Sequence, residues 1–431
     1  MNGERDIVIV DGARTPFVKS GTELARVSAV DLGRIAMREA IERAEIDPAW
    51  IDEVIVGNIA GPPDSANIAR VIALNAKVPK HVPAYTVNRN CASGLQAVVE
   101  AAYRIRSGDA DIVVAGATES MSQIPLLFRP DAQEIWTRVA RSRGALAKLG
   151  ACASFRPKHF NPVIGLMLGL TDPVSGLNMG QTAEVLAREW GISRHEQDTF
   201  ALRSHQLATT AWAEGRMARE VIPVPLPTKY RTASTEDNGI RKNQTMEALG
   251  KLRPVFDRKY GTVTAGNSSQ ITDGAAALVL ASAKRAKELG LRELGRLRSW
   301  GFAGCDPERM GLGPVLATPI ALRRAGNIPI DRFDLVEINE AFAAQVIACM
   351  RAFESREFFQ SWVGTAPPGA PDPERVNVNG GAIALGHPVG ATGGRLVLTL
   401  LEEMTRRDAS LGLATLCVGG GQGGALVLER S

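Results

Sequence analysis

The sequence predicts an α/β fold of two related halves, in which mixed sheets are covered by helices and a further domain is inserted into the first half. Three observations lead to this prediction. Apolar stretches with strand spacing and with helix spacing alternate along most of the 431 residues. Three segments of the N-terminal part recur in the same order near the C-terminus. The composition, 45% hydrophobic and 22% charged, is typical of a globular chain of two or three domains.

The first repeated unit reads as a helix that leads into a strand. In the N-terminal part, Ala-Ile-Glu-Arg-Ala at 40–44 precedes the apolar segment 51–56. Near the C-terminus, Ala-Leu-Arg-Arg-Ala at 321–325 precedes the segment 333–338. Each short apolar segment has the length and composition of a buried strand.

The second repeated unit reads as a strand, a turn and a helix. One copy runs from Val87-Asn88 into Cys91-Ala-Ser-Gly, and the other combines Val376-Asn377 with Gly390-Ala-Thr-Gly. After Cys91 the apolar residues recur with helix spacing, and residues 111–115 then form a short apolar strand.

The third repeated unit is a final strand, Ala-Ala-Leu-Val-Leu at 276–280 and Gly-Ala-Leu-Val-Leu at 424–428. In the C-terminal half a glycine turn joins it to the strand ending near Cys417, whereas about 150 residues separate the equivalent strands of the N-terminal half. We therefore predict these domains: an N-terminal half at 1–121 completed by about 264–285, an inserted loop domain at 122–263 with helices at 182–190 and 194–212, and a C-terminal half at 286–431. Two halves related by a pseudo-twofold axis bring their strand-to-helix junctions together, and a shared site is expected there.

Charge and hydropathy exclude several classes of protein. The formal net charge is +4, yet residues 129–158 hold seven basic and two acidic side chains, so the remainder is nearly neutral. A nucleic-acid surface would need basic and aromatic residues over a wider area, so no nucleic-acid partner is expected. No stretch reaches the roughly 18 apolar residues of a membrane span. The strand at 7–10 follows the start too closely for a signal peptide, and five cysteines in so long a chain are expected to stay reduced, which favours a cytoplasmic location.

Cys91 is the first candidate catalytic residue. It lies where a strand turns into a helix, and the positive end of the helix dipole would favour the thiolate that a nucleophilic cysteine needs. The alternative is a small thiol that only packs, the usual role of a free cysteine. The motifs that accompany Cys91 favour the catalytic interpretation.

Three further candidates lie in turns of the repeat. His387, in Gly386-His-Pro-Val-Gly, sits in a shaped loop before the second copy of the Cys91 helix and is a candidate base. Cys417 ends an apolar strand before Val-Gly-Gly-Gly, whose backbone N–H groups can bind an oxyanion. Asn339 ends a strand and can hold a water or donate to a carbonyl oxygen, although such a residue is more often a turn or cap residue.

Other patterns carry no function. Gly419, Gly421 and Gly424 match Gly-x-Gly-x-x-Gly, but a terminal strand follows them instead of the helix of a dinucleotide site. No histidine and cysteine cluster has ligand spacing, so no metal is expected. The remaining cysteines and histidines show no pattern and are expected to serve packing: Cys152, Cys305, Cys349, His81, His159, His195 and His205.

In this order, the motifs resemble those of the thiolase family, and the resemblance extends over nearly the whole chain. They are Asp11-Gly-Ala-Arg-Thr-Pro-Phe, Asn90-Cys-Ala-Ser-Gly, Asn339-Glu-Ala-Phe-Ala, Gly386-His-Pro-x-Gly-Ala-Thr-Gly and Cys417-x-Gly-Gly-Gly. The resemblance implies the thiolase fold, with two pseudo-symmetric βαβαβαββ halves in a five-layer αβαβα sandwich and an inserted loop domain. It also implies an acyl-CoA C-acyltransferase that cleaves 3-ketoacyl-CoA with coenzyme A, and acetoacetyl-CoA synthesis is the nearest alternative.

The resemblance further implies a role for each motif residue. Cys91 would be the nucleophile that accepts the acyl group, His387 its base and a donor to the thioester oxygen, and Cys417 the acid and base at the substrate carbon or sulfur. Asn339 would place the water of one oxyanion hole, while the backbone N–H groups of Cys91 and Gly419 would form the other.

Two more positions match residues that contact the substrate in relatives. Ser269, in Gly266-Asn-Ser-Ser-Gln, matches a position that touches coenzyme A, and Met179 matches one that lines the acyl pocket. Coenzyme A is expected as a substrate, with no permanently bound cofactor. A decarboxylating condensing enzyme would lack Cys417, and a non-catalytic lipid-binding subunit is disfavoured by the presence of Cys91, His387 and Cys417.

The stretch 122–178 exceeds the matching segment of compact biosynthetic thiolases. Together with 353–362 it resembles the thiolase subunit of fatty-acid oxidation complexes, which usually carries His in place of Asn339. The expected partners are acyl-CoA, CoA, further copies in a homodimer or homotetramer, and a β-oxidation α-subunit. Apolar residues of 122–178 lie roughly on one helical face beside basic ones: Ile135, Val139, Leu146 and Leu149. Three uses stay open for this face, namely contact with a membrane surface or a partner, packing on the body, and attraction of coenzyme A phosphates.

Overall fold

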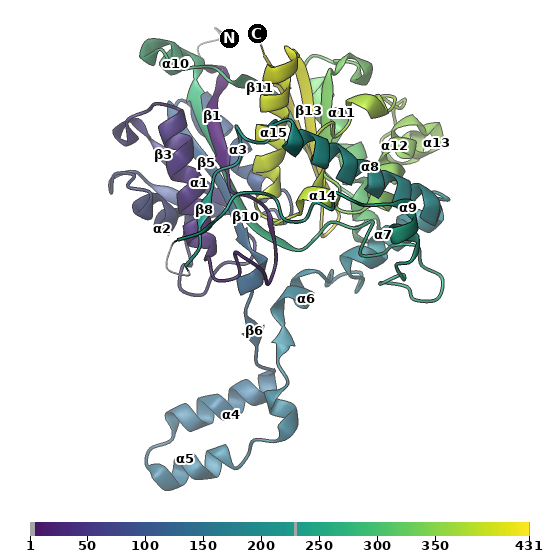
Figure 1. Cartoon of the computed structure of the whole chain (residues 1–431). Coiled ribbons are helices and arrows are strands. Elements are labelled where there is room, and N and C mark those ends of the chain that lie inside the picture. Colours follow the sequence, from purple (N-terminus) through teal and green to yellow (C-terminus); the bar gives the residue numbers. More distant parts are fainter. Residues whose placement is uncertain (1–4, 228–230, 431) are drawn as a thin grey trace.

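The computed structural model of the chain describes residues 5–227 and 231–430 (Figure 1). The first four residues of the predicted N-terminal half and the last residue of the predicted C-terminal half lie outside the described residues. The strands are β1 (Ile7–Arg14), β2 (Val18–Lys19), β3 (Glu53–Gly57), β4 (Ala84–Val87), β5 (Ile112–Ser120), β6 (Leu126–Leu127), β7 (Val163–Ile164), β8 (Val224–Pro225), β9 (Ala233–Ser234), β10 (Thr272–Ser282), β11 (Gly295–Gly304), β12 (Leu335–Ile338), β13 (Leu411–Val418) and β14 (Gln422–Glu429).

The α-helices are α1 (Ala29–Arg43), α2 (Ile68–Asn75), α3 (Ser93–Ser107), α4 (Pro130–Arg141), α5 (Ala145–Cys152), α6 (Gly165–Gly169), α7 (Met179–Glu189), α8 (Arg194–Ala213), α9 (Met246–Gly250), α10 (Ala283–Leu289), α11 (Gly313–Arg324), α12 (Ala343–Glu354), α13 (Arg356–Trp362), α14 (Ala382–Leu385) and α15 (Thr392–Arg407). Short 3₁₀ helices are η2 (Pro48–Trp50), η3 (Met121–Gln123), η4 (Pro157–Phe160), η5 (Pro307–Leu312), η6 (Ile330–Arg332) and η7 (Pro373–Arg375).

The large strands form one sheet in the order β12-β13-β14-β11-β1-β10-β5-β3-β4, with β2 beside β10. The order is symmetric about the contact between β1 and β11, which pair only from Ile7 to Ile9. On one side β5 pairs antiparallel with β10 and parallel with β3, and on the other β13 pairs antiparallel with β14 and parallel with β12. The repeated segments of the sequence therefore occupy equivalent places in two halves of the sheet.

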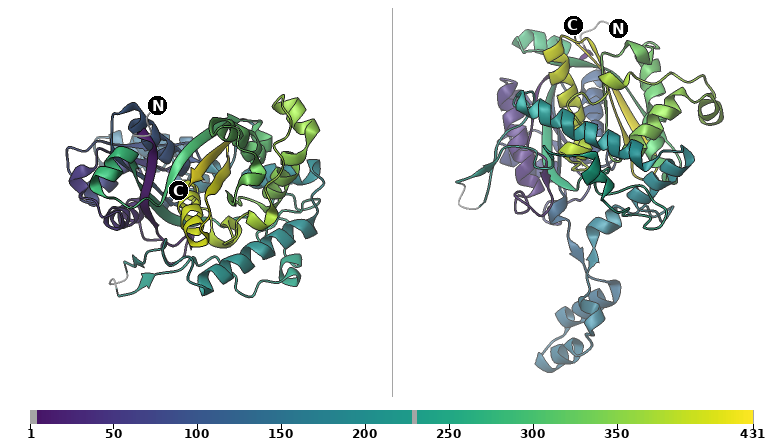
Figure 2. Two further views of the ribbon diagram at one scale, coloured as in Figure 1. Left: turned by 90° about the horizontal axis from the view of Figure 1, so that it is seen from above. Right: turned by 45° about the vertical axis from the view of Figure 1, so that its right-hand side comes forward.

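Helices cover and separate these halves in the αβαβα order, which confirms the predicted fold (Figures 1 and 2). Helices α1 and α2 pack on the outer face of the N-terminal half, and α11 packs on that of the C-terminal half. Helices α3 and α15 lie between the halves, where Leu95, Leu396 and Leu416 belong to one buried cluster. Burial on both faces explains why the central strands read as continuous apolar runs.

One strand of the second half differs from the predicted order. The backbone at Val376 makes a single bridge with Val336 in place of a full strand. The next residue, Asn377, has a φ of 50° and turns the chain, and its amide bonds the backbone N–H and C=O of Ile338. Although β5 and β10 are adjacent in the sheet, residues 121–271 separate them in the chain. The predicted inserted loop domain at 122–263 stays a proposal.

Helices α3 and α15 touch at their first turns because glycines leave room for the two backbones. A Cβ on Gly94 would meet the backbone nitrogen of Gly394, and one on Gly393 would meet the backbone of Gly94 and Leu95. This close approach requires residues without side chains. As a result, the loops that precede the two helices are brought to one place, and these loops carry Cys91 and His387.

A buried charge network ties β1 to the long segment between β5 and β10. The guanidinium of Arg14, which is fully buried, contacts Glu220 Oε1 at 2.7 Å and both carboxylate oxygens of Asp237 at 2.7 and 2.8 Å. Asp237 Oδ1 also accepts a hydrogen bond from the backbone N–H of Phe17 at 2.6 Å. Each charge in this network depends on its partners, because none is solvated.

Replacing Arg14 by Met is expected to lower the free energy of unfolding by about 3–5 kcal/mol, because two buried carboxylates lose their partner. Urea denaturation at fixed protein concentration measures this. Arg188→Met is the matched control, since Arg188 pairs with Asp257 at 3.3 Å on the surface and its loss should cost less than about 1 kcal/mol. Equal effects of the two substitutions would contradict the prediction.

Residues 126–164 form an arm that extends away from the body (Figures 1 and 2). Strands β6 and β7 pair as its stem, and α4 packs on α5 and η4. Trp136 joins these elements, with ring centroids 5.9 Å from Phe128 and 4.8 Å from Phe155. Among the described residues, no helix combines the length and apolar character needed to cross a membrane.

The arm corrects two expectations. The face expected to run from Ile135 to Leu149 is divided between two helices, because the chain turns at Gly144 with a φ of 88°. Ile135 is buried within the arm, whereas Leu146 and Leu149 are 86% and 65% exposed. Among the described residues, α4 and α5 pack on each other and make no comparable contact with a helix or strand of the body. Leu146 and Leu149 therefore face outward.

Candidate active site

Cys91 lies between β4 and α3, and its side chain borders the loop that follows β13. The backbone N–H of Gly419 and that of Cys91 itself donate toward the thiol. Burial nevertheless raises the pKa of the Cys91 thiol above its usual value, because the loss of solvent outweighs these donors. Any favourable effect of the helix dipole is therefore outweighed by burial, and the resting thiol keeps its proton. Cys91 needs a base.

Cys417 is the second-last residue of β13 and is 1% exposed. Burial is the main reason why the pKa of its thiol lies well above the usual value, and the neighbouring thiol of Cys91 raises it further. The two cysteines, far apart in the sequence, therefore lie within electrostatic reach of each other. A thiol with so high a pKa keeps its proton until a strongly basic atom arrives.

The loop before Cys91 is hydrogen-bonded to the loop after Cys417 through the side chains of Arg89 and Asn90. Asn90 Nδ2 donates to the carbonyl oxygen of Gly419 at 2.7 Å, and Asn90 has a φ of 44°, which Asn tolerates well. Arg89 Nη1 donates to Gln422 Oε1 at 3.0 Å, and its guanidinium lies 4.3 Å from the centroid of the Phe302 ring. The backbone N–H groups of Cys91 and Gly419 are held near one another by these contacts.

His387 and Asn339 meet beside this pair of loops. Asn339 Nδ2 lies 3.5 Å from His387 Nε2, and both side chains are buried. Burial, and then the positive charge of Arg395, lower the pKa of His387 to about 3. The imidazole is therefore neutral near pH 7 and can accept a proton. Asn339 Oδ1 is buried and has no hydrogen-bond partner among the described residues.

Glu119 is a buried residue of this region that the sequence did not single out. At the end of β5, its carboxylate accepts hydrogen bonds from the backbone N–H groups of Ile59 and Ala60 at 3.0 and 3.1 Å, and from that of Gly390. Burial raises the pKa of Glu119 to about 7. It ties the loop containing His387 to the N-terminal half. An acidic residue at the end of an otherwise apolar strand was the available indication.

Thr392 was also missed, although it stands in the motif that contains His387. Its Oγ1 lies 2.6 Å from His387 Nδ1. A hydroxyl at the start of a helix, following a histidine loop, was the only indication in the sequence.

The two residues expected to contact substrate flank the same region. Met179 begins α7, and its sulfur lies 3.2 Å from the point where a Cβ on Gly419 would stand. The N–H of Ser269 donates to the carbonyl of Ala341 at 3.0 Å, two residues after Asn339, and the carbonyl of the next residue, Gln270, accepts from the N–H of His387 at 3.1 Å. All seven predicted site residues therefore lie in segments that contact one another.

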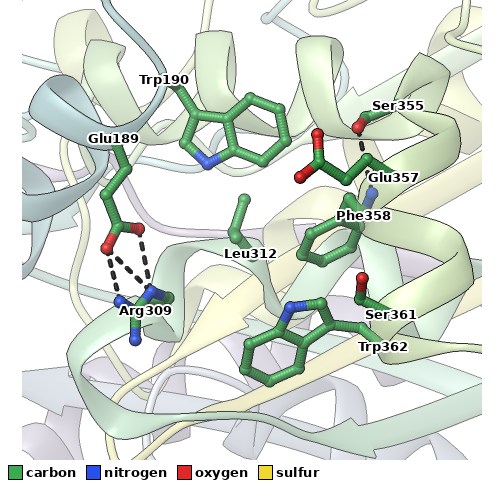
Figure 3. A pocket seen from close by; sticks show the side chains of 9 residues that line it. All are labelled: Glu189, Trp190, Arg309, Leu312, Ser355, Glu357, Phe358, Ser361 and Trp362. Carbon is green, nitrogen blue, oxygen red and sulfur yellow. Dashed lines mark hydrogen bonds and ion pairs between the residues drawn. The ribbon is translucent and has the colours of Figure 1, made fainter.

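A cavity of about 310 Å³ lies elsewhere, between α7, η5 and α13 (Figure 3). Trp190, Phe358 and Trp362 form its walls, and Arg309 pairs with Glu189 at its side. It contains none of the seven candidates. In residues 5–227 and 231–430, no group of three or more His, Cys, Asp or Glu side chains could hold a metal ion.

Comparison with known families gives two matches that together span most of the chain. Residues 7–284 match the family described as thiolase, N-terminal domain, and residues 291–430 match the thiolase, C-terminal domain. A 3-ketoacyl-CoA thiolase of Serratia proteamaculans is 42% identical over 430 residues, covering 99% of this chain and 97% of the relative. One of Yersinia pestis is 43% identical over 429 residues, with the same coverage.

Solved structures agree with these matches. The chain is similar to the crystal structure of the Bacillus anthracis acetyl-CoA acetyltransferase, with a TM-score of 0.87, 37% identity and 100% of each chain covered. It is similar to human mitochondrial 3-ketoacyl-CoA thiolase, with a TM-score of 0.86, 36% identity and 99% of each chain covered. The same human protein in complex with CoA has a TM-score of 0.85, with 99% of this chain and 98% of that chain covered. With both halves matched and relatives of this identity over nearly its whole length, the chain belongs to the thiolase family.

Proposed function

We propose that the chain is an acyl-CoA C-acyltransferase that cleaves 3-ketoacyl-CoA with coenzyme A, giving acetyl-CoA and an acyl-CoA shortened by two carbons. The observation that carries this proposal is that the thiols of Cys91 and Cys417 lie within electrostatic reach of each other, with the Gly419 N–H directed at Cys91. The loop that carries the neutral His387 is brought to the loop of Cys91 by the contact between α3 and α15. A hydrolase would need one thiol and an activated water. Two thiols fit a reaction that breaks a carbon–carbon bond and then transfers an acyl group.

In the first half of the reaction, His387 Nε2 takes the proton of Cys91, and the thiolate attacks the 3-keto carbon. The resulting oxyanion accepts hydrogen bonds from the N–H groups of Cys91 and Gly419. The C2–C3 bond then breaks: the acyl group stays on Cys91 and the electron pair forms the enolate of acetyl-CoA. The enolate oxygen accepts from protonated His387 and from a water held by Asn339, whose buried Oδ1 is available to it.

Cys417 completes this half by giving its proton to C2 of the enolate, which releases acetyl-CoA. The high pKa of Cys417 suits this step, because the thiol stays protonated until a carbanion is formed. In the second half, the Cys417 thiolate takes the proton of incoming coenzyme A. The coenzyme A sulfur attacks the acyl group on Cys91, and His387 returns its proton to Cys91 as the shortened acyl-CoA leaves. Each residue ends in its starting state.

Loss of the absorbance of magnesium-complexed acetoacetyl-CoA upon addition of coenzyme A tests the activity. Turnover that needs both substrates supports the proposal, and binding of acyl-CoA without turnover would indicate a non-catalytic thiolase-like subunit instead. A series of 3-ketoacyl-CoA substrates of increasing length then establishes chain preference. A degradative role predicts that longer substrates are cleaved at least as well as acetoacetyl-CoA.

A biosynthetic acetoacetyl-CoA thiolase is the second candidate. It is favoured by the similarity to an acetyl-CoA acetyltransferase and by Asn339, where subunits of oxidation complexes usually carry His. Cleavage confined to acetoacetyl-CoA would establish this alternative. A cytoplasmic location is also proposed, and the five cysteines, all unpaired thiols, support a reducing compartment.

We further propose that the chain assembles as a homodimer or homotetramer. Strand β4 lies at the end of the sheet and all four of its residues are only half-buried, so its outer edge is open to a second copy. Multi-angle light scattering of the purified chain measures the mass directly. Co-purification from the native host tests whether a β-oxidation α-subunit is also bound.

The arm is proposed to contact an anionic membrane surface. Leu146 and Leu149 are exposed on α5, while the predicted basic stretch from 129 to 158 runs along the same segment. Apolar side chains beside basic ones are typical of helices that lie at a lipid surface. The electrostatic attraction of the basic residues to lipid headgroups weakens as the salt concentration rises. The contribution from burying the two leucines is not screened by salt.

Leu146→Asp combined with Leu149→Asp is expected to reduce binding to phosphatidylglycerol vesicles roughly tenfold or more, because the buried apolar area is lost and like charge is added. Sedimentation with vesicles measures this, and neutral phosphatidylcholine vesicles should bind weakly. Val255→Asp, at an exposed apolar residue outside the arm, is the control. If the wild-type chain does not sediment with anionic vesicles, the membrane proposal is wrong and a protein partner is favoured.

A further inference from the structure

Thr392 is the first residue of α15 and is fully buried. Its Oγ1 lies 2.6 Å from Nδ1 of His387 and 3.1 Å from the carbonyl oxygen of Pro388. The contact with His387 is the closest polar contact of the imidazole among the described residues. The side chain therefore touches the proposed base on the ring nitrogen that faces away from Asn339.

The hydrogens of this group can be assigned by counting donors. A threonine hydroxyl has one proton to donate and lone pairs that accept. Its proton is directed to the Pro388 carbonyl, four residues earlier, which is the usual partner of a hydroxyl within a helical turn. The lone pairs of Oγ1 are then left to accept from His387. This requires that Nδ1 of His387 carries the proton.

The contact on the other side of the ring is compatible with the same assignment. Asn339 presents its amide nitrogen, a donor, to His387 Nε2 at 3.5 Å. A donor facing Nε2 is compatible with a lone pair there and not with a second N–H. Because the imidazole is neutral, only one of its nitrogens holds a proton, and both contacts place that proton on Nδ1.

We propose that Thr392 is a positioning residue that holds His387 in the Nδ1–H tautomer, so that Nε2 is free to take the proton of Cys91. This inference rests on the proposed function and adds to it a residue that does not touch the substrate. With the proton on Nε2 instead, His387 could donate to a carbonyl oxygen but could not deprotonate the thiol. The 2.6 Å contact with the hydroxyl also holds the orientation of the ring.

Thr392→Val and Thr392→Ser test this proposal. Valine keeps the shape of threonine without the hydroxyl, whereas serine keeps the hydroxyl. We expect Thr392→Val to lower kcat for thiolysis roughly 10- to 100-fold with KM changed less than about threefold. Thr392→Ser should retain kcat within about threefold of the wild type.

Thr399→Val is the matched control. Thr399 lies on the same helix and is also buried, but its hydroxyl has no hydrogen-bond partner among the described residues. The same change of shape at this position should leave kcat within about twofold, so a general effect of valine in α15 is separated from the effect on His387. A Thr392→Val enzyme with wild-type kcat would overturn the proposal, as would a rise in KM alone.

Nitrogen NMR gives a readout that does not depend on turnover. The chain has only five histidines, and ¹⁵N shifts distinguish the protonated ring nitrogen from the unprotonated one. In the wild type, the His387 signals, assigned with His387→Gln, should show the Nδ1–H form, and Thr392→Val should shift the population toward Nε2–H. A wild-type ring protonated on Nε2 would refute the inference even if the enzyme is active. An inactive wild type with the Nδ1–H ring would instead contradict the proposed function.

Discussion

Replacement of Cys91 by alanine is expected to abolish thiolysis, with a loss of at least about 10⁴-fold in kcat, because no other thiol can carry the acyl group. Mass spectrometry after mixing with acetyl-CoA should find one acetyl group on the wild-type chain and none on Cys91→Ala. The alternative site would be Cys417, but its fuller burial and higher pKa keep it protonated.

The controls for this experiment are two cysteines outside the candidate site. The sequence predicted a packing role for both, which Cys349 fits, whereas Cys152 is exposed. Cys349 is buried and donates to the carbonyl of Gly311 at 3.0 Å, and Cys152 lies exposed on the arm. Cys152→Ala should keep full activity and full acetylation, and Cys349→Ala should keep acetylation even if stability falls. Peptide mapping that places the acetyl group on any residue other than Cys91 would overturn the assignment of the nucleophile.

Replacement of Cys417 by alanine is expected to separate the two halves of the chemistry. Acetylation of Cys91 by acetyl-CoA needs no proton at carbon, so the acyl-enzyme should still form. Cleavage of acetoacetyl-CoA should fall by about 10³-fold or more, because the enolate has no acid to protonate C2. Comparing the thermal unfolding of Cys417→Ala with that of the wild type separates a loss of stability from the loss of this acid.

The readouts for Cys417→Ala are acetylation by mass spectrometry and deuterium exchange at C2 of acetyl-CoA. Exchange requires the proton to be removed and returned at carbon, and it should disappear in Cys417→Ala while persisting in Cys152→Ala. If Cys417→Ala still exchanges this deuterium at the wild-type rate, another group is the acid. If acetylation is lost as well, the two thiols do not have the separate roles proposed here.

Much of the fold could be predicted from the sequence because the repeated units are local. The segments around 51–56 and 333–338 became β3 and β12, and those around 276–280 and 424–428 became β10 and β14. The spacing of apolar residues in a helix and the composition of a Gly-rich turn involve only neighbouring residues. Both can therefore be read directly from the sequence. The missing strand at Val376 departs from this pattern because Asn377 adopts a positive φ, which the repeat did not reveal.

The electrostatic character of the site could not be predicted in the same way. The start of a helix suggested an acidic thiol at Cys91, yet burial raises its pKa. Likewise, burial and Arg395 keep His387 neutral, and the outward direction of Leu146 depends on how the arm folds on itself. The solvent exposure of a side chain depends on how the whole chain packs, so it cannot be predicted from a local motif.

By itself, the sequence predicted which residues carry the chemistry, since the proposed nucleophile, base and acid stand in short motifs that resemble those of the thiolase family. Only the tertiary structure decided how they act: that Thr392 contacts Nδ1 of His387, that Asn339 presents its amide nitrogen to Nε2, and that Gly419 lies against Cys91. The physical reason is that a pKa depends on burial and a tautomer depends on the direction of hydrogen bonds. Burial and hydrogen-bond direction are established only where glycines let α3 and α15, from opposite halves of the chain, approach each other.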